Sequence, residues 1–333
     1  MMIQCQNKRI GPQMFCGLLL GLCFGWSGCG TPTKQEPARP VAARTPLNDL
    51  PSAYRELWAA WIEQAADWPI RREMALEDPG LTRFLVENLI GELITAYKAG
   101  AFTQPGADRL GQYDLIKQEL VAIGAPAAGP LAELLALGNG DGPAIAGDVL
   151  EALGGAGVPA VSNQLLRTDN SRARGLAAEL LTRLPLSRGN EIEVQALLIE
   201  LLRSDSDWTV RKYSALALAR RSRDLSARRG DARDSTASDR ALGALSRALV
   251  DSDSAVSEAA AVGLGLAGDV RAVPALINHL ERILRSTDLS HARSAYRSLF
   301  NLTGVQDLRG TAAWREWWRL HGKARIDVQR DPG

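Results

Sequence analysis

Cysteine, histidine and closely spaced carboxylates are the residues of this chain whose types could bind a metal or act in catalysis. All four cysteines lie within the first 29 residues, so the rest of the chain has no thiol for a disulfide or a metal site. None of the three histidines, His279, His291 and His321, stands in a metal-binding pattern such as His-Glu-x-x-His. We therefore predict structural histidines, no metal, no cofactor and no catalytic residue.

Two Asp-x-Asp pairs, Asp205/Asp207 and Asp251/Asp253, are similar in spacing to the start of a calcium-binding loop. In both segments a valine stands at the sixth loop position, where such a loop needs glycine, and an aliphatic residue stands at the twelfth, where it needs glutamate. Short acidic segments also accept hydrogen bonds from the free N–H groups at the start of a helix. We therefore predict that these aspartates cap helices.

The composition favours a helical protein without a strongly charged partner. Of the 333 residues, 46% are hydrophobic but only 5% are aromatic, which suits a core of many small helix contacts. The 39 basic and 38 acidic residues leave a formal charge of +1, which provides no general attraction to nucleic acid or acidic lipid.

The first 29 residues have the features of an export signal. Lys8 and Arg9 precede an apolar run over residues 14–26, which is too short to span a membrane. The sequence Trp26-Ser27-Gly28-Cys29 resembles the lipobox of bacterial lipoproteins, although an aliphatic residue is usual at the position of Trp26. The resemblance implies a lipoprotein signal peptide over residues 1–29 and a lipid on Cys29, with ordinary signal cleavage near Cys29 as the alternative.

Residues 30–49 are polar and rich in proline, a composition typical of a disordered tether between an anchor and a folded domain. Gly30 follows Cys29, whereas aspartate is usual at this position in lipoproteins that stay in the inner membrane. The resemblance therefore implies a lipid-anchored protein of the bacterial cell envelope that faces the periplasm or the exterior, with the outer membrane favoured.

An internal repeat determines the architecture expected for residues 108–304. Five segments begin at residues 142, 173, 210, 256 and 292, and a sixth, weaker one begins near residue 112. Apolar residues in each segment recur at the spacing that lines one face of a helix. Another apolar helix pattern precedes the later copies, and short turns with Asp or Ser join the two helices. The sequence thus predicts one helical hairpin repeated in tandem.

This hairpin resembles the HEAT repeat, and bacterial members of that family in particular. The likeness rests on the first-helix pattern Pro274-Ala275-Leu276-Ile277 and on a small residue or valine followed by arginine at the start of the second helix. The second feature occurs as Ala173-Arg174, Val210-Arg211 and Ala292-Arg293, whereas Val256-Ser257 departs from it. The resemblance implies an all-α fold, a right-handed α-solenoid of about five or six HEAT-like hairpins with N- and C-terminal capping helices.

In the HEAT family the second helix of each hairpin usually forms the inner, concave wall, so its polar residues are candidates for contact with a partner. The alternative is that these side chains are only solvated. Carried over to this chain, the candidate partner-binding residues are Arg174, Arg183, Arg211, Lys212, Glu258, Arg293 and Arg297.

The N-terminal flank, residues 50–107, differs from the repeats and is expected to cap them. It contains two helical stretches separated by the breaker Asp78-Pro79-Gly80. The helical spacing of Trp58 and Trp61, with Trp68 nearby, favours core packing, and an aromatic cradle for a ligand is the alternative.

The C-terminal flank, residues 305–333, is expected to be a Trp-rich capping helix and a tail. Trp314, Trp317 and Trp318 share one helical face, which can close the exposed end of the core. A contact with a membrane or a partner is the alternative, because tryptophan beside arginine also suits a membrane surface.

Arginine is concentrated between residues 220 and 240, where seven arginines accompany four aspartates. The Ser, Asp and Gly content of this segment predicts a mobile loop over residues 222–239. A solvated loop is the first interpretation, and docking of a protein or a nucleic acid are the alternatives. The interleaved aspartates and the export signal count against nucleic acid.

These features favour a non-catalytic protein-binding scaffold, lipid-anchored on the extracytoplasmic side of a bacterial membrane. The HEAT family consists mainly of scaffolds, and its iron hydroxylases depend on His-Glu dipeptides that this sequence lacks. The expected partners are a protein and, through the lipid on Cys29, the membrane. The alternative is an intracellular HEAT-type nucleic-acid-binding or lyase-like protein that uses the Arg-rich segment 220–240.

Overall fold

The computed structural model describes residues 49–107, 109–137, 140–227, 232–287 and 289–330, without the side chains of residues 165–167, 188, 224–234 and 330. Every regular element within these ranges is a helix, and they contain no strand. This confirms the predicted all-α fold. The signal peptide, the lipidation site Cys29 and the tether lie outside the described residues, apart from Asp49 at the end of the tether.

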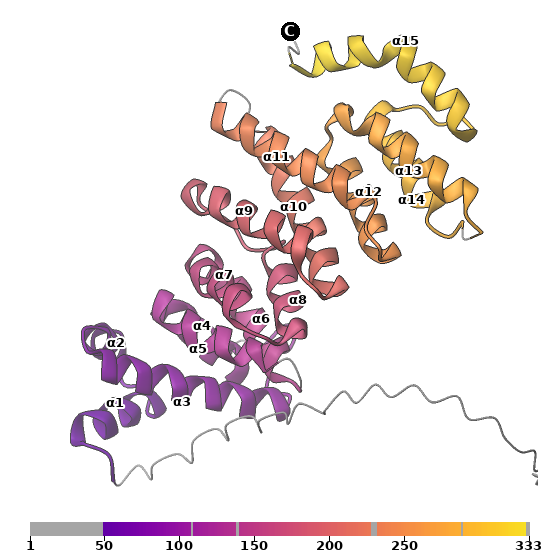
Figure 1. Ribbon diagram of the computed structural model, residues 1–333. Helices are drawn as coiled ribbons and strands as arrows, with labels where there is room; N and C mark the ends of the chain where they lie inside the picture. The colour runs from indigo at the N-terminus through magenta and orange to yellow at the C-terminus, as the bar shows by residue number, and fades with distance from the viewer. Residues whose placement is uncertain (1–48, 108, 138–139, 228–231, 288, 331–333) are drawn as a thin grey trace, which may run out of the picture. The chain divides into compact units, whose positions relative to one another are not determined.

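The helices follow one another closely in chain order (Figure 1). They are α1 (Ser52–Ile62), α2 (Trp68–Leu76), α3 (Pro79–Lys98), α4 (Gln112–Ile123), α5 (Ala125–Ala136), α6 (Gly142–Leu153), α7 (Val158–Arg167), α8 (Ser171–Leu180), α9 (Arg188–Ser204), α10 (Trp208–Ala227), α11 (Ala232–Ala248), α12 (Ser254–Ala267), α13 (Val273–Arg285), α14 (Ala292–Thr303) and α15 (Gly310–Arg330), with the short 3-10 helices η2 (Gly154–Gly157) and η3 (Val270–Ala272).

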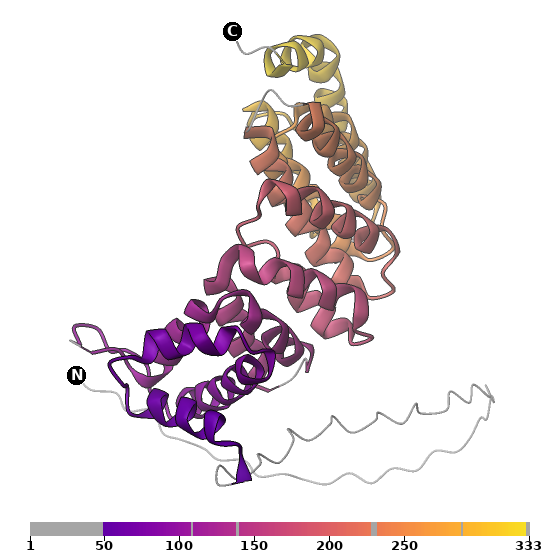
Figure 2. The ribbon, with the colours of Figure 1, turned by 90° about the vertical axis from the view of Figure 1, so that its left-hand side faces the viewer.

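Successive helices pair into hairpins, and the hairpins stack. Each of α5, α7, α9, α11 and α13 packs against the helix that follows it. The second helices α4, α6, α8, α10, α12 and α14 also contact one another in that order. The predicted segments that begin at residues 142, 173, 210, 256 and 292 therefore lie side by side, as a HEAT-like α-solenoid requires (Figure 2).

One apolar cluster runs through the whole stack. It extends from Leu57 in α1 to Trp314 in α15 and includes the predicted helix faces, such as Ile145 and Val149 in α6. Small residues on α10 and α12 allow their backbones to approach closely, because Ala219 lies opposite Gly263. Each hairpin thus buries its apolar face against its neighbours, and no hairpin has a core of its own.

The N-terminal cap has three helices where two stretches were expected. The chain turns between α1 and α2, and Gln64 has a positive φ of 50° at this turn. Trp61 and Trp68 are buried against each other with ring centroids 5.3 Å apart, and Trp58 is also buried. This confirms core packing for the three tryptophans and leaves no exposed cradle among them.

The C-terminal helix α15 packs on α13 and η3. Trp314 is 1% exposed and belongs to the apolar cluster, while Trp317 and Trp318 are partly buried against it. Gln329 also accepts a hydrogen bond from the Val270 N–H and donates one to the Gly268 carbonyl. These contacts agree with the predicted capping role of this helix.

The Arg-rich segment is largely helical, which corrects the predicted loop over residues 222–239. Helix α10 continues to Ala227 and α11 begins at Ala232, so only residues 228–231 between them lie outside the described part. Arg221 is buried and donates to the carbonyls of Leu181 and Leu184. This long polar side chain can be buried because its donors reach main-chain carbonyls in the turn that follows α8.

Among the residues that the structure describes, one stretch, Gly142–Gln164, is long and apolar enough to span a membrane by length and composition. In the structure it consists of α6, η2 and part of α7. Ile145, Val149 and Val161 are fully buried in the apolar cluster, so the stretch forms part of the solenoid core.

Candidate protein-binding surfaces

Arg174, a predicted binding residue, holds two hairpins together. Its Nε and Nη2 donate to the two carboxylate oxygens of Asp205 at 2.8 and 2.9 Å, and its Nη1 donates to the Thr168 carbonyl. The side chains of Arg174 and Asp205 are only 13% and 6% exposed. The hydrogen bond with Asp205 raises the pKa of Arg174. Arg174 is therefore a structural residue, which corrects its assignment to the binding surface.

Arg211 repeats this arrangement one hairpin later. It forms a two-pronged ion pair with Asp251, and its Nη1 donates to the Asp205 carbonyl. Asp205 thus binds Arg174 through its carboxylate and Arg211 through its main chain. Arg211 is also withdrawn from the predicted binding surface, because its guanidinium donors already have protein partners.

The predicted capping role is confirmed for Asp207 and Asp253. Asp207 accepts from the Thr209 N–H at the start of α10, and Asp253 accepts from the Ala255 N–H at the start of α12. Asp205 and Asp251 accept from the N–H groups of Asp207 and Asp253 and therefore close the turns before these helices.

The pairing changes in the next hairpin, where Ser257 stands at the position of the arginine. Glu258 takes part instead: its carboxylate lies 2.8 Å from His291 Nδ1 and accepts a hydrogen bond from the Ser294 hydroxyl. Glu258 remains partly exposed. This predicted residue therefore joins α12 to α14 and still reaches solvent.

Arg183 lies just after α8 in a partly exposed ion-pair network. Its guanidinium donates to Glu151 of α6 at 2.8 Å and to Glu179 of α8 at 3.3 Å. A similar link joins α4 and α6, because Lys117 and Tyr113 both donate to Asp148. Burial and the hydrogen bond to Asp148 raise the pKa of Tyr113. The second helices of the N-terminal hairpins are thus connected by paired charges.

The remaining predicted residues are more accessible. The Lys212 ammonium lies 5.8 Å from the Trp208 ring centroid and 5.6 Å from that of Tyr213, which are cation–π distances. Arg293 and Arg297 are exposed on α14 and have no ion pair within the described part of the chain. Trp208 is 44% exposed at the start of α10 and was not singled out from the sequence.

These accessible residues come from α10, α12 and α14, which pack in that order. Trp208 could have been found because it lies outside the apolar stripe of α10, which begins at Val210. We use the name second-helix surface for Trp208, Lys212, Glu258, Arg293 and Arg297.

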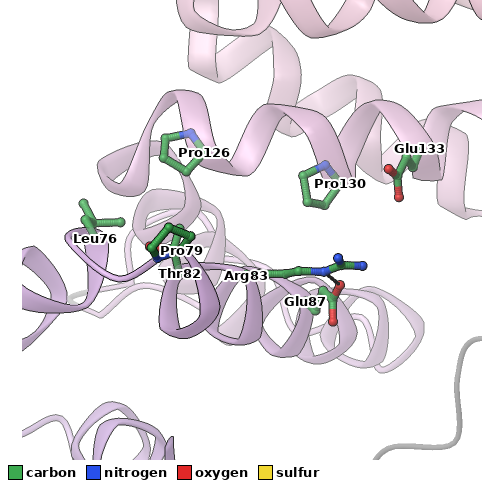
Figure 3. A pocket seen from close by; sticks show the side chains of 8 residues that line it. All are labelled: Leu76, Pro79, Thr82, Arg83, Glu87, Pro126, Pro130 and Glu133. Carbon is green, nitrogen blue, oxygen red and sulfur yellow. Dashed lines mark hydrogen bonds and ion pairs between the residues drawn. The ribbon is translucent and has the colours of Figure 1, made fainter.

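A groove of about 460 Å³ lies between α3 and α5 (Figure 3). The rings of Pro126 and Pro130 on α5 face Pro79 and Arg83 on α3. The two prolines are four residues apart and so share one helix face. The groove is lined by Leu76, Pro79, Thr82, Arg83, Glu87, Pro126, Pro130 and Glu133.

One cation and two carboxylates give this groove its charge. The exposed Arg83 donates to Glu87 at 2.7 Å, and this hydrogen bond, with the charges of Glu87 and Glu133, raises the pKa of Arg83. The groove therefore combines rigid apolar rings with a net negative edge, which suits a short peptide better than an anion.

The histidines have structural environments. His279 is buried, and its Nδ1 lies 3.2 Å from the Leu249 carbonyl oxygen and 3.3 Å from Arg282 Nη2. Burial, followed by the charge of Arg282, lowers the pKa of His279 to about 4. His321 stacks on Trp317 at the surface. Among the described residues, no three His, Cys, Asp or Glu side chains are grouped so that they could hold a metal ion.

Comparison with protein families matches residues 196–299 to HEAT repeats. The match runs from α9 to α14 and confirms a HEAT-like repeat protein in this part of the chain. No protein of curated function matches the sequence.

Comparison with solved structures gives helical proteins of low identity. One is the complex of CpcE and CpcF of phycocyanin lyase from Nostoc sp. PCC7120, at 23% identity and a TM-score of 0.43, covering 53% of this chain and 98% of that one. Two engineered proteins each cover 77% of this chain at 20% identity, with TM-scores of 0.37 and 0.36 and with 98% and 100% of their own chains matched.

The presence of a lyase among these structures corrects one expectation. The repeat pattern led us to predict that the chain is not an enzyme, and an enzyme with a similar fold contradicts that prediction. The likeness assigns no substrate or reaction to this chain.

Proposed function

We propose that this HEAT-like solenoid is a protein-binding scaffold, held by a lipid on Cys29 at the extracytoplasmic side of a bacterial membrane. The observation that carries the proposal is the second-helix surface. There, Arg293 and Arg297 lack ion pairs within the described residues, and Trp208 is exposed beside Lys212. Exposed tryptophan and arginine are the residue types that contribute most to protein interfaces.

The charge of this surface defines the chemistry of its partner. Three of its members are cationic, and the carboxylate of Glu258 is already engaged by His291 and Ser294. An acidic segment with an apolar side chain for Trp208 complements this surface. A row of stacked hairpins can spread such contacts over a long surface.

The lipid anchor is tested separately from partner binding. A palmitate analogue should label the full chain, and Cys29→Ser should remove the label, because the thiol is the acceptor in lipoproteins of this kind. A labelled Cys29→Ser chain, or an unlabelled unsubstituted chain in the cytoplasm, contradicts the anchored form.

Partner binding is tested by cross-linking in membranes followed by capture of the full chain. The variant Arg293→Glu/Arg297→Glu should lose the captured partner, and Trp208→Ala should weaken its capture. Arg203→Glu is the matched control, since Arg203 is 68% exposed on α9, a first helix of the stack. Equal loss with the control, or full retention by the α14 variant, contradicts binding at the second-helix surface. Salt-sensitive binding of DNA or RNA through Arg220 and Arg223 would support the nucleic-acid alternative instead.

A further inference from the structure

Most of the highly exposed large hydrophobic side chains of the described ranges lie at the two ends of the stack. Six such residues in the described ranges are at least 58% exposed. Val250 is on a turn inside the stack, and the other five are Ile62, Ile70, Met74, Leu320 and Val328, on α1, α2 and α15. Terminal elements of a solenoid usually present a polar outer face, because they have no neighbour to cover them. Apolar side chains in these places indicate a contact surface.

The N-terminal group is acidic. Ile70 and Met74 are four residues apart on the outward face of α2, and Ile62 ends α1 nearby in the chain. Glu63 and Glu77 flank them, and neither forms an ion pair within the part of the chain that the structure describes. We define the acidic end-face as Ile62, Glu63, Ile70, Glu73, Met74 and Glu77.

The C-terminal group is basic. Leu320 is 59% exposed near the middle of α15, and Lys323 lies one turn away with no ion pair to any described residue. The Arg325 guanidinium lies over the Trp317 ring, 5.9 Å from the ring centroid. Arg325 is also close to Val328 in the sequence. We define the basic end-face as Leu320, Lys323, Arg325 and Val328.

The charges of residues 49–333 follow the same division. Residues 49–167 contain 8 basic and 16 acidic side chains, whereas residues 168–333 contain 26 basic and 21 acidic ones. Within residues 49–333 the N-terminal part is therefore negative and the C-terminal part is positive. Opposite charges on two surfaces of one molecule favour contact between different ends of two copies.

We propose that this chain associates head to tail with a second copy of itself, the acidic end-face of one copy binding the basic end-face of the next. Met74 and Ile70 pack against Leu320 and Val328, and Lys323 pairs with the free glutamates. Contact of one end-face with the same end-face of a second copy would bring like charges together. The head-to-tail contact instead continues the stacking of helices from one chain to the next.

The inference does not depend on the proposed partner of the second-helix surface, whose residues lie on α10, α12 and α14. It also differs from membrane binding by the ends, because the acidic end-face would be repelled by anionic lipid.

Disulfide cross-linking tests the contact directly. Full-length chains with the four native cysteines replaced by serine are purified in mild detergent, and single cysteines are introduced as Met74→Cys or Leu320→Cys. Mixing these two variants should give a cross-linked dimer, while each variant alone should not. Val250→Cys is the matched control, since Val250 and Met74 are both 66% exposed. The yield of cross-linked dimer from Met74→Cys mixed with Leu320→Cys should exceed the yield from Val250→Cys mixed with Leu320→Cys by about fivefold or more.

Charge exchange tests the polarity of the contact. Adding Lys323→Glu to the Leu320→Cys chain should reduce the yield of cross-linked dimer several-fold. Adding Glu73→Lys/Glu77→Lys to the Met74→Cys chain should then restore that yield. Higher salt should reduce the cross-linked yield of the Met74→Cys and Leu320→Cys pair without these charge substitutions. The proposal is overturned if Met74→Cys or Leu320→Cys cross-links with itself as well as with the other, or if the mixed pair does not exceed the Val250→Cys control. It is also overturned if the end-faces bind lipid vesicles while no cross-link forms.

Discussion

Arg211 and Asp251 are forty residues apart in the sequence, and their side chains meet in a two-pronged ion pair. The Arg211 Nε and Nη2 atoms lie 2.9 and 2.8 Å from the two carboxylate oxygens of Asp251. Both side chains are less than 15% exposed. Burial acts to raise the pKa of Asp251, but the hydrogen bond from Arg211 and the Asp253 N–H hold it below its usual value. The pair joins the start of α10 to the turn before α12.

Removing one partner of this pair should strongly destabilise the protein. In Arg211→Met the carboxylate of Asp251 stays largely buried without its cation, and we expect a loss of about 3 kcal/mol in the free energy of unfolding. Urea denaturation followed by circular dichroism measures it. The double variant Arg211→Met/Asp251→Asn should recover part of the loss, because asparagine leaves no buried charge and can still accept from the Asp253 N–H. Arg293→Met is the control and should change stability by less than about 0.5 kcal/mol. Equal effects of the two methionine variants would contradict the structural role.

His279 should make the stability fall as the pH decreases from about 6.5 to about 4. Burial holds the pKa of its folded form at about 4, whereas the unfolded chain takes up the proton near pH 6.5. Between these values the unfolded state binds more protons, so stability is lost as the pH falls, by roughly 3 kcal/mol at most. Denaturation curves at several pH values measure this slope. His279→Gln cannot titrate and should show a smaller loss over this window; an unchanged slope would argue against His279 as the cause.

Gly265 should tolerate no side chain. A Cβ at this position of α12 would lie 2.7 Å from the Cβ and hydroxyl oxygen of Ser298 on α14. Gly265→Ala should therefore force the two helices apart and destabilise the chain by about 1–3 kcal/mol. Gly129→Ala is the matched control, because nothing lies within 4 Å of its added Cβ on α5. That control should stabilise the protein by up to about 1 kcal/mol through its helix propensity. Thermal unfolding distinguishes the two, and a neutral Gly265→Ala would contradict the close α12–α14 contact.

Pro130 should lower the stability of α5. It lies inside the helix and cannot donate a backbone hydrogen bond, yet its ring lines the groove opposite α3. Pro130→Ala restores this donor, so we expect the free energy of unfolding to increase. The increase should be only about 1 kcal/mol, because proline also restricts the unfolded chain and the substitution removes that benefit. Urea denaturation checks the change. A loss of stability would show that packing of the proline ring stabilises the protein more than the missing helix hydrogen bond would.

The hairpins could be predicted from the sequence because each depends on contacts local to one helix or one turn. The apolar spacing from Ile145 to Leu153 defines a buried face, and Asp207 and Asp253 cap the next helices within two residues. The prediction was wrong where the local composition and the tertiary packing favour different structures. The polar residues between 222 and 239 predicted a loop, but packing of α10 and α11 against their neighbours extends both helices into this segment.

The free and the paired arginines could not be separated from the sequence. Arg174, Arg211 and Arg293 occupy the same position at the start of a second helix. Arg174 and Arg211 pair with Asp205 and Asp251 in the turn before the next second helix. Only α15 follows α14 in the described chain, so Arg293 has no such turn to meet and remains exposed.

The sequence alone determined that the chain is a series of helical hairpins, because periodicity and capping act within a few residues. The tertiary structure decided which side chains are free to bind, because an arginine's partner belongs to the next hairpin and is placed by stacking. It also decided that Ile70, Met74 and Leu320 remain uncovered, since burial of an end depends on whether another helix follows it.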